Sequence, residues 1–191
     1  MPATTKFSKE TIIEAAFNVA CQEGLDHMTI RLIAKRMGSS IAPLYVNFES
    51  VEDLKKAVMD KAQTIFHSMI KALNHDDLFL RYAIASISFS KKYPKIYNYF
   101  LLNEDNPLDS EKNVNMMLTT LRENPTYDKF DKDSLMKFII SMQALQVGLS
   151  IIARKSFYQP YLKEKDLVEL LDKTGLALIN NLLKNMETNN D

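Results

Sequence analysis

Residues 29–48, TIRLIAKRMGSSIAPLYVNF, constrain the fold of this chain more than any other stretch of similar length. Apolar residues recur at intervals of three and four from Ile30 to Met37, which predicts a short helix with one apolar face. Thr29 can cap the start of this helix, and Gly38 follows it where a left-handed residue is needed. The spacing therefore predicts a short helix, a tight turn and a second short helix.

The second helix of this pair has no charged side chain between residues 39 and 48. We expect Ser39 or Ser40 to cap it, and Pro43 falls in its first turn, where the missing N–H costs nothing. Three residues are expected to anchor this helix on a core: Leu44, Tyr45 and Phe48. A helix pair of this kind can place its second helix in the major groove of DNA.

Apolar periodicity and breaking residues predict further helices along the rest of the chain. The expected ranges are 8–23, 50–73, 77–92, 94–103, 110–123, 131–156 and 163–187. Ser8 offers a cap for the first range, and Ser50 with Asp53 resembles a capping box at the second. Loops are expected at 103–109 and 123–131. Together with only four glycines, these segments predict an all-α fold.

Composition argues against several classes of protein. The chain has 24 Lys and Arg residues against 24 Asp and Glu residues, so no overall attraction to nucleic acid or to membranes is expected. Cys21 is the single cysteine, which excludes an intrachain disulfide and fits a reducing cytoplasm. We find no signal region and no apolar run of about 18 residues, so we expect neither secretion nor membrane spanning.

The stretch from Ile12 to Leu54 resembles the N-terminal domain of TetR-type transcriptional repressors. The matching positions are Ala15–Ala16, Glu23–Gly24, Thr29, Ile33–Ala34, Gly38, Leu44–Tyr45, Phe48 and Asp53–Leu54. One departure is Val51, because the family commonly carries a lysine there that meets a DNA phosphate. The resemblance implies a helix-turn-helix head over residues 1–49 and a ligand-binding and dimerisation domain over residues 50–191. About nine helices would complete that architecture.

The resemblance also implies a function, namely a repressor released from its operator by a small molecule. The residues expected to meet DNA are Thr29, Arg31, Ser39, Ser40, Ile41, Ala42, Pro43, Tyr45, Asn47 and Lys55. Ser40 and Asn47 can hydrogen-bond base edges, whereas Ile41 and Ala42 can press on thymine methyl groups. The second helix has no arginine or lysine to read guanine, so we predict an operator rich in A·T pairs.

The last two predicted helices carry apolar residues over more than one face, so they are buried on more than one side. They form either the centre of one domain or a four-helix interface between two copies. The residues expected at a dimer interface are Leu145, Gly148, Leu149, Ile152, Leu171, Leu178 and Leu182. A twofold dimer would present two recognition helices to a palindromic DNA operator.

A small-molecule pocket is expected among the middle helices, for a largely apolar ligand. Candidate wall residues are Phe66, Met69, Phe89, Tyr93, Tyr97, Phe100, Met117, Phe138, Met142 and Gln146. Methionine and tyrosine supply adaptable apolar surface with a few polar tips. The competing interpretation is that these residues form ordinary core.

Catalytic and cofactor motifs do not emerge from the sequence. His27, His67 and His75 are too scattered to form one metal-ligand set, and no nucleotide-binding glycine loop is present. We therefore expect neither an enzyme nor a cofactor or metal site. The alternative to a regulator is a helical protein-interaction module that binds a partner through its wide apolar faces, with residues 29–48 as scaffold.

Overall fold

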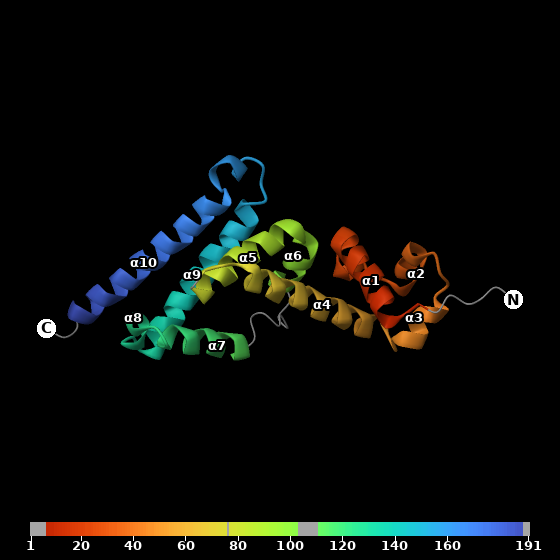
Figure 1. Ribbon diagram of the computed structural model, residues 1–191, viewed down its shortest axis with the longest axis horizontal. Coiled ribbons are helices and arrows are strands. Elements are labelled where there is room, and N and C mark those ends of the chain that lie inside the picture. The colour runs from red at the N-terminus through yellow and green to blue at the C-terminus, as the bar shows by residue number, and fades with distance from the viewer. Residues whose placement is uncertain (1–6, 76, 103–110, 189–191) are drawn as a thin grey trace. The chain divides into compact units, whose positions relative to one another are not determined.

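The computed structural model describes residues 7–75, 77–102 and 111–188, and the loop predicted at 103–109 lies outside them. Within the described residues the chain forms ten α-helices and two short 3-10 helices, without strands (Figure 1). The all-α prediction is thereby confirmed. The chain divides into two compact units, Met1–Met69 with Tyr93–Asn103, and Ile70–Lys92 with Glu104–Asp191. The domain boundary proposed at residues 49 and 50 stays a prediction.

The first unit is built on a three-helix head. It holds α1 (Lys9–Glu23), a 3-10 helix (Leu25–His27), α2 (Ile30–Met37), α3 (Ala42–Asn47), most of α4 (Val51–Ala72) and α6 (Pro94–Leu102). Helix α1 packs against both α2 and α6. Its core side chains are fully buried at Ile12, Ala16 and Ala20, which are four residues apart and therefore share one face of the helix.

Capping residues define the starts of α1 and α4 as the sequence predicts. The Thr11 N–H donates to Ser8 Oγ at 3.2 Å, so Ser8 caps α1. At the start of α4 the Asp53 N–H donates to Ser50 Oγ at 3.1 Å, and the Ser50 hydroxyl donates back to the Asp53 carboxylate at 3.0 Å. Each cap satisfies N–H groups that have no partner inside the helix.

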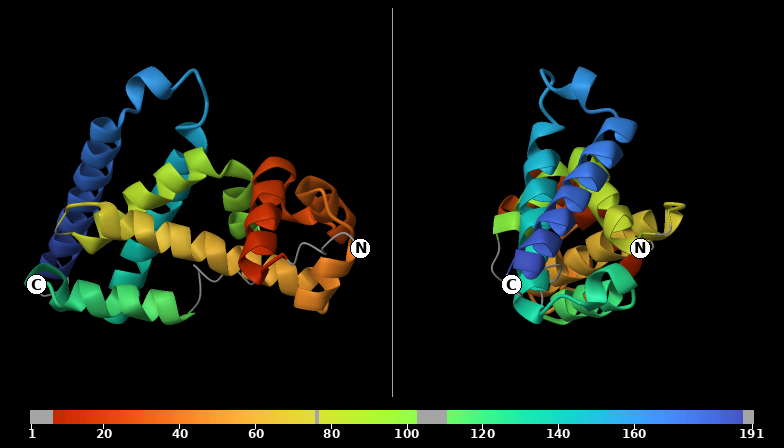
Figure 2. Two further views of the ribbon diagram at one scale, coloured as in Figure 1. Left: turned by 45° about the vertical axis from the view of Figure 1, so that its right-hand side comes forward. Right: turned by 90° about the vertical axis from the view of Figure 1, so that its left-hand side faces the viewer.

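The second unit holds α5 (Leu78–Lys92), α7 (Glu111–Arg122), α8 (Pro125–Asp128), α9 (Lys132–Ile152), a 3-10 helix (Gln159–Tyr161) and α10 (Glu164–Thr188). Helices α5, α9 and α10 pack against one another, and α9 and α10 run side by side (Figure 2). Their shared core includes Leu135, Phe138, Leu167 and Leu171.

A small polar network lies inside this apolar core. The Ser90 hydroxyl donates to the Ser150 carbonyl at 3.1 Å, which joins α5 to α9. The Gln146 side-chain amide donates to Ser86 Oγ across the same pair of helices. Because buried polar groups are costly without partners, this network favours one register of α5 against α9.

Helix α8 corrects the prediction of nine helices, because the segment 123–131 was expected to be a loop. The Thr126 N–H donates to Asn124 Oδ1 at 2.9 Å, and Pro125 occupies the first turn. An asparagine cap followed by proline is a helix start. The helix is four residues long, which is too short to produce a periodic apolar pattern.

One helix differs from the expectation that no segment could span a membrane. Among the described residues α9 is long and apolar enough to do so by length and composition, with a mean hydropathy of 1.6. This is weak evidence for a span, because α9 packs against both α5 and α10 and its side chains at Leu135, Phe138 and Ile139 lie in the core.

Candidate nucleic-acid interface

The predicted helix-turn-helix is present, and its turn is made by Gly38. The Leu32 N–H donates to Thr29 Oγ1 at 3.2 Å, so Thr29 caps α2 as predicted. Gly38 ends α2 with φ of 64°, in the left-handed region that glycine adopts without steric cost. The Ser39 N–H then donates to the Ala34 carbonyl at 3.0 Å, which closes the turn.

Helix α3 starts later than the sequence predicted. Its N-cap is Ile41, and neither Ser39 nor Ser40 accepts a capping hydrogen bond from it. The Ser39 hydroxyl instead donates to the Ser40 carbonyl at 3.0 Å. The capping prediction for these two serines is therefore wrong, because they belong to the turn. Pro43 lies in the first turn of α3, as predicted.

Leu44 and Phe48 anchor α3 on the head, with 0% and 5% of their surface exposed. Tyr45 was expected to join them and does not, because 57% of its surface is exposed. Leu44 and Phe48 are four residues apart and share one side of the chain, whereas the residue after Leu44 is turned by about 100° along an α-helix. The Tyr45 ring therefore lies outside the core.

The outer side of α3 is formed by apolar and small residues. Ser40, Ile41 and Ala42 are exposed, as predicted for residues that meet DNA. Val46 is 80% exposed and was missed by the sequence analysis. The sequence allowed the exposure of Val46 to be predicted, because a helix that buries Leu44 and Phe48 turns Val46 outward. Asn47 is half-buried, and its Nδ2 donates to the Pro43 carbonyl at 2.8 Å. This leaves its amide N–H groups less free for bases than predicted.

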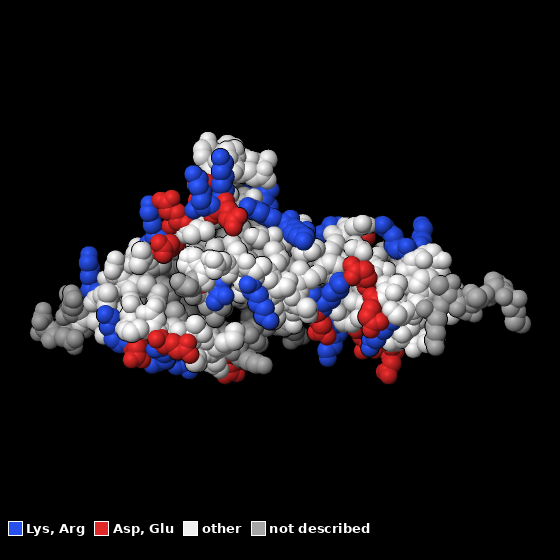
Figure 3. Space-filling view, in the orientation of Figure 1, with Lys and Arg blue, Asp and Glu red and all other residues white. Residues whose placement is uncertain are grey.

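Charges around the head are mixed rather than uniformly basic. Arg36 pairs with Glu23 at 3.2 Å, and Lys55 pairs with Glu52 at 3.6 Å. The predicted phosphate contact of Lys55 is thus partly neutralised by its own helix. Arg31, by contrast, is exposed at the start of α2. Figure 3 likewise shows Lys and Arg interspersed with Asp and Glu on the face in view.

The predicted ligand residues are divided between the two units. Phe66, Met69, Tyr93, Tyr97 and Phe100 belong to the first unit, and Phe89, Met117, Phe138, Met142 and Gln146 to the second. Three of them, Phe66, Phe89 and Phe100, are among the largest fully buried side chains. Phe138 and Met142 line a cavity of about 50 Å³ within the second unit.

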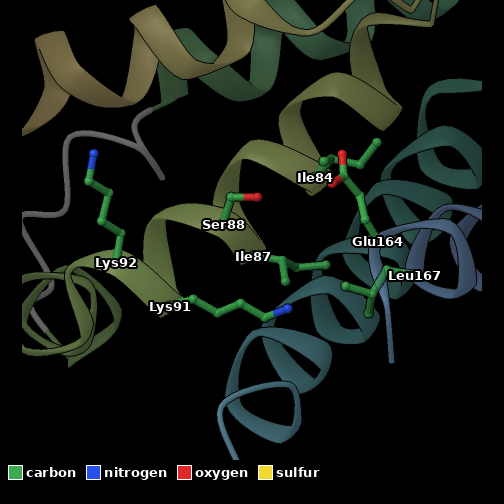
Figure 4. Close-up of a pocket in the computed structure, with 7 residues that line it drawn as sticks. All are labelled: Ile84, Ile87, Ser88, Lys91, Lys92, Glu164 and Leu167. Atoms are coloured by element: carbon green, nitrogen blue, oxygen red, sulfur yellow. The ribbon is translucent and has the colours of Figure 1, made fainter. Parts of the chain in front are cut away.

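A larger cavity in the second unit was not predicted. It measures about 390 Å³ and opens between α5 and α10 (Figure 4). Apolar side chains of Ile84, Ile87 and Leu167 line it together with Ser88. Lys91, Lys92 and Glu164 supply its charged side chains. Sequence periodicity does not reveal such a cavity, because it depends on how two helices 70 residues or more apart come together.

The predicted interface residues fall into two groups. Leu149 and Leu171 are 5% and 1% exposed and belong to the core of the second unit, so they are wrongly placed at a dimer interface. Four others are half-buried, namely Leu145, Gly148, Leu178 and Leu182, and Ile152 is 36% exposed. The large apolar side chains left exposed on α9 and α10 are Ile140, Ile151, Ile152, Leu170, Leu176 and Met186.

Sequence comparison finds relatives of the N-terminal part of the chain, and structure comparison finds relatives of the whole fold. Residues 12–58 match the family of bacterial regulatory proteins of the tetR type. An uncharacterized HTH-type transcriptional regulator of Mycobacterium tuberculosis is 32% identical over 99 residues, which cover 50% of this chain and 45% of that protein. The matched stretch thus spans less than half the length of this relative.

Two solved structures share the fold at low sequence identity. A transcriptional regulator from Rhodococcus sp. Rha1 is 17% identical with a TM-score of 0.61, over 92% of this chain and 97% of that one. A TetR variant from Acinetobacter baumannii AYE in complex with minocycline is 16% identical with a TM-score of 0.56, over 94% and 98%. The match over residues 12–58 therefore assigns the head to the tetR type of bacterial regulatory proteins, and the two solved structures show that the whole chain shares their fold.

Proposed function

We propose that the protein is a sequence-specific DNA-binding transcriptional regulator that inserts α3 into the major groove. The observation that carries this proposal is the presentation of α3. Leu44 and Phe48 anchor it, Gly38 sets the turn before it, and its outer side remains exposed. In helix-turn-helix proteins that outer side reads the base edges.

The chemistry of α3 favours A·T pairs. Ile41 and Val46 are 44% and 80% exposed, and Ala42 is exposed beside them. Apolar side chains of this kind contact the thymine methyl group, whereas guanine is read mostly by arginine or lysine. Ser40 can add a hydrogen bond to a base edge. The operator is therefore expected to be A·T-rich where α3 contacts it.

Phosphate contacts come from the residues around α3. Thr29 and Tyr45 expose hydroxyl groups, and Arg31 exposes a guanidinium at the start of α2. Phosphate contacts fix the position of a protein on DNA without reading sequence. Arg36 and Lys55 are paired with carboxylates, which reduces the positive charge that these two residues offer to DNA. The affinity should accordingly fall less steeply with salt than for a strongly basic head.

The active species is proposed to be a twofold dimer joined through α9 and α10. Ile140 and Leu176 are 56% and 52% exposed on these helices, and such apolar surface is typical of a homodimer interface. Two copies of α3 related by a twofold axis would bind the two halves of a palindromic operator.

Regulation is proposed to be repression in the cytoplasm, released by a small-molecule effector that is largely apolar. The family and the fold support this. A TetR variant with the same fold was solved in complex with minocycline. The cavity of about 390 Å³ between α5 and α10 offers space for a small molecule in this chain. No catalytic step is assigned to the protein.

The experiment that tests the proposal is selection of bound sequences from a random DNA pool with purified protein. An A·T-rich, palindromic consensus is expected, and a mobility shift on a fragment of the protein's own promoter should follow. Val46→Glu should abolish binding, because a carboxylate on the exposed side of α3 repels phosphates. Met116→Glu is the matched control, since Met116 is 54% exposed on α7.

Two outcomes would contradict the proposal. One is the absence of any enriched sequence with folded, dimeric protein, which would favour the protein-interaction module. The other is a consensus that is rich in G·C pairs at the positions contacted by residues 40–43, which would refute the readout assigned to α3.

A further inference from the structure

A second, smaller cavity in the second unit combines aromatic rings with carboxylates. It measures about 50 Å³ and lies where the start of α5 and helices α8, α9 and α10 meet. Phe79, Tyr127 and Phe138 line it, together with Asp77 and Asp172. No lysine or arginine is among the lining residues.

The three rings form one connected aromatic wall. The Phe79 and Phe138 ring centroids are 6.0 Å apart, and those of Tyr127 and Phe138 are 5.6 Å apart. Both ring pairs are tilted, at 40° and 53°. The face of an aromatic ring attracts a cation through its quadrupole, and groups of rings recognise quaternary ammonium ligands in this way.

Two carboxylates add negative charge to the same cavity, one from the residue before α5 and one from α10. Asp77 accepts hydrogen bonds from the Phe79 and Leu80 N–H groups at 2.7 and 3.1 Å, which holds its carboxylate in place at the start of α5. Asp172 lies on α10 and makes neither a hydrogen bond nor an ion pair within the described part of the chain. Burial raises the pKa of the Tyr127 hydroxyl, and the negative charges of Asp77 and Asp172 raise this pKa further.

Gly175 contributes to the space in this cavity. A methyl group at this position would lie 3.5 Å from Met142 Cε, which is an ordinary van der Waals contact. Alanine therefore fits at residue 175 without displacing its neighbours, yet it would occupy room inside the cavity. The cavity can be reduced by this substitution without damage to the fold.

We propose that this cavity binds the head group of an organic ammonium ion, with the aromatic wall of Phe79, Phe138 and Tyr127 beside it and the carboxylates of Asp77 and Asp172 near its charge. A buried water needs roughly 10–15 Å³ of comparable volume, so the cavity accepts a group of about four heavy atoms. A trimethylammonium group has this size. The apolar remainder of the cavity suits methyl substituents better than a hydrated metal ion.

Choline chloride is the probe, and its uncharged carbon isostere dimethylbutanol is the control ligand. Isothermal titration calorimetry of the full chain should show saturable choline binding and at least about tenfold weaker binding of the isostere. Asp172→Asn should weaken choline binding about tenfold, since it removes one facing charge. Glu169→Gln is the matched control variant on the same helix and should leave choline binding unchanged, because Glu169 pairs with Lys173 outside the cavity.

Gly175→Ala tests whether choline binds in this cavity without changing any charged residue. It should weaken choline binding at least about tenfold while the melting temperature stays equal or rises, because alanine favours a helix. Equal binding of choline and its isostere, or unchanged choline binding by Gly175→Ala, would overturn the proposal. So would equal losses from Asp172→Asn and Glu169→Gln, and so would the absence of choline binding at millimolar concentration. Binding is measured without DNA, so this inference and the regulator proposal can fail separately.

Discussion

Tyr45 is adjacent in sequence to a core residue, but its side chain lies outside the core. Its neighbour Leu44 is fully buried, whereas 57% of Tyr45 is exposed. This placement makes the hydroxyl available to a phosphate. Because phosphate contacts carry no sequence information, Tyr45→Ala should weaken binding to many DNA sequences by a similar factor, about tenfold.

Ile41 is the comparison for this test, since it is 44% exposed on the side assigned to base reading. Ile41→Ala should change the order of preference among operators rather than lower all affinities alike. Both variants should keep the stability of the wild type, because exposed side chains contribute little to it. The measurement is the affinity of each variant for a panel of DNA fragments. A loss of sequence preference in both variants would contradict the assignment of Tyr45 to phosphate contact and of Ile41 to base reading.

Gly38 contributes to the head through its backbone conformation alone. Its φ is 64°, and no atom lies within 4 Å of the position a Cβ would take. Gly38→Ala should therefore lower the free energy of unfolding by about 1–2 kcal/mol through left-handed strain. Gly175→Ala lies within a helix at an ordinary φ and should raise it by up to about 1 kcal/mol. Urea unfolding of both variants measures the difference, and equal effects would contradict it.

At the scale of elements, the start of α9 depends on one carboxylate. The Ser134 N–H donates to Asp131 at 2.7 Å, and this bond lowers the pKa of Asp131 below its ordinary value. A carboxyl group whose pKa is lowered by folding stabilises the protein above its unfolded pKa of about 3.9, and this stabilisation is lost as pH falls through the folded pKa.

Asp131→Asn tests this cap, because asparagine also caps helices and does not titrate. The variant should lose less stability than the wild type between neutral pH and about pH 3. Unfolding midpoints in urea across that range provide the measurement. Parallel curves for the two proteins would show that Asp131 is not responsible for the acid dependence.

Helix ends were predicted best where the signal lies within one turn. Thr29, Gly38 and the Ser50–Asp53 pair act as expected, because each contacts a backbone group within five residues. The start of α3 was misplaced, since two serines in succession offered equivalent caps and the turn used both. Helix α8 was missed because four residues do not reveal a period.

At the scale of the whole molecule, dimerisation is the property that mutations can test most directly. Leu176 is 52% exposed on α10, so Leu176→Glu should leave the protomer folded and convert the dimer to a monomer. Operator affinity should then fall by about a hundredfold or more, since two linked heads bind far better than one.

Met116→Glu is again the matched control, with an exposed fraction close to that of Leu176 on a helix outside the proposed interface. Light scattering coupled to size-exclusion chromatography gives the mass of each variant. A monomeric wild type, or a dimeric Leu176→Glu variant, would remove α10 from the proposed interface.

The apolar residues of α9 and α10 show what sequence periodicity cannot assign. Leu149 and Leu171 were grouped with the interface but lie in the core, whereas Ile140 and Leu176 are exposed. All four belong to helices that carry apolar residues on more than one face, so the sequence does not show which face meets the core. Their separation depends on which side of each helix meets α5, and this is a contact between segments distant in sequence.

Sequence alone determined the helical class, most helix boundaries and the turn at Gly38, because caps, periodicity and left-handed glycine act over a few neighbouring residues. Only tertiary structure decided that Asp77, Tyr127 and Asp172 surround one cavity. These residues are about 50 positions apart along the chain. They come together because of how α5, α8 and α10 pack. Packing depends on how the side chains of different helices fit against one another, and a local sequence pattern does not contain that information.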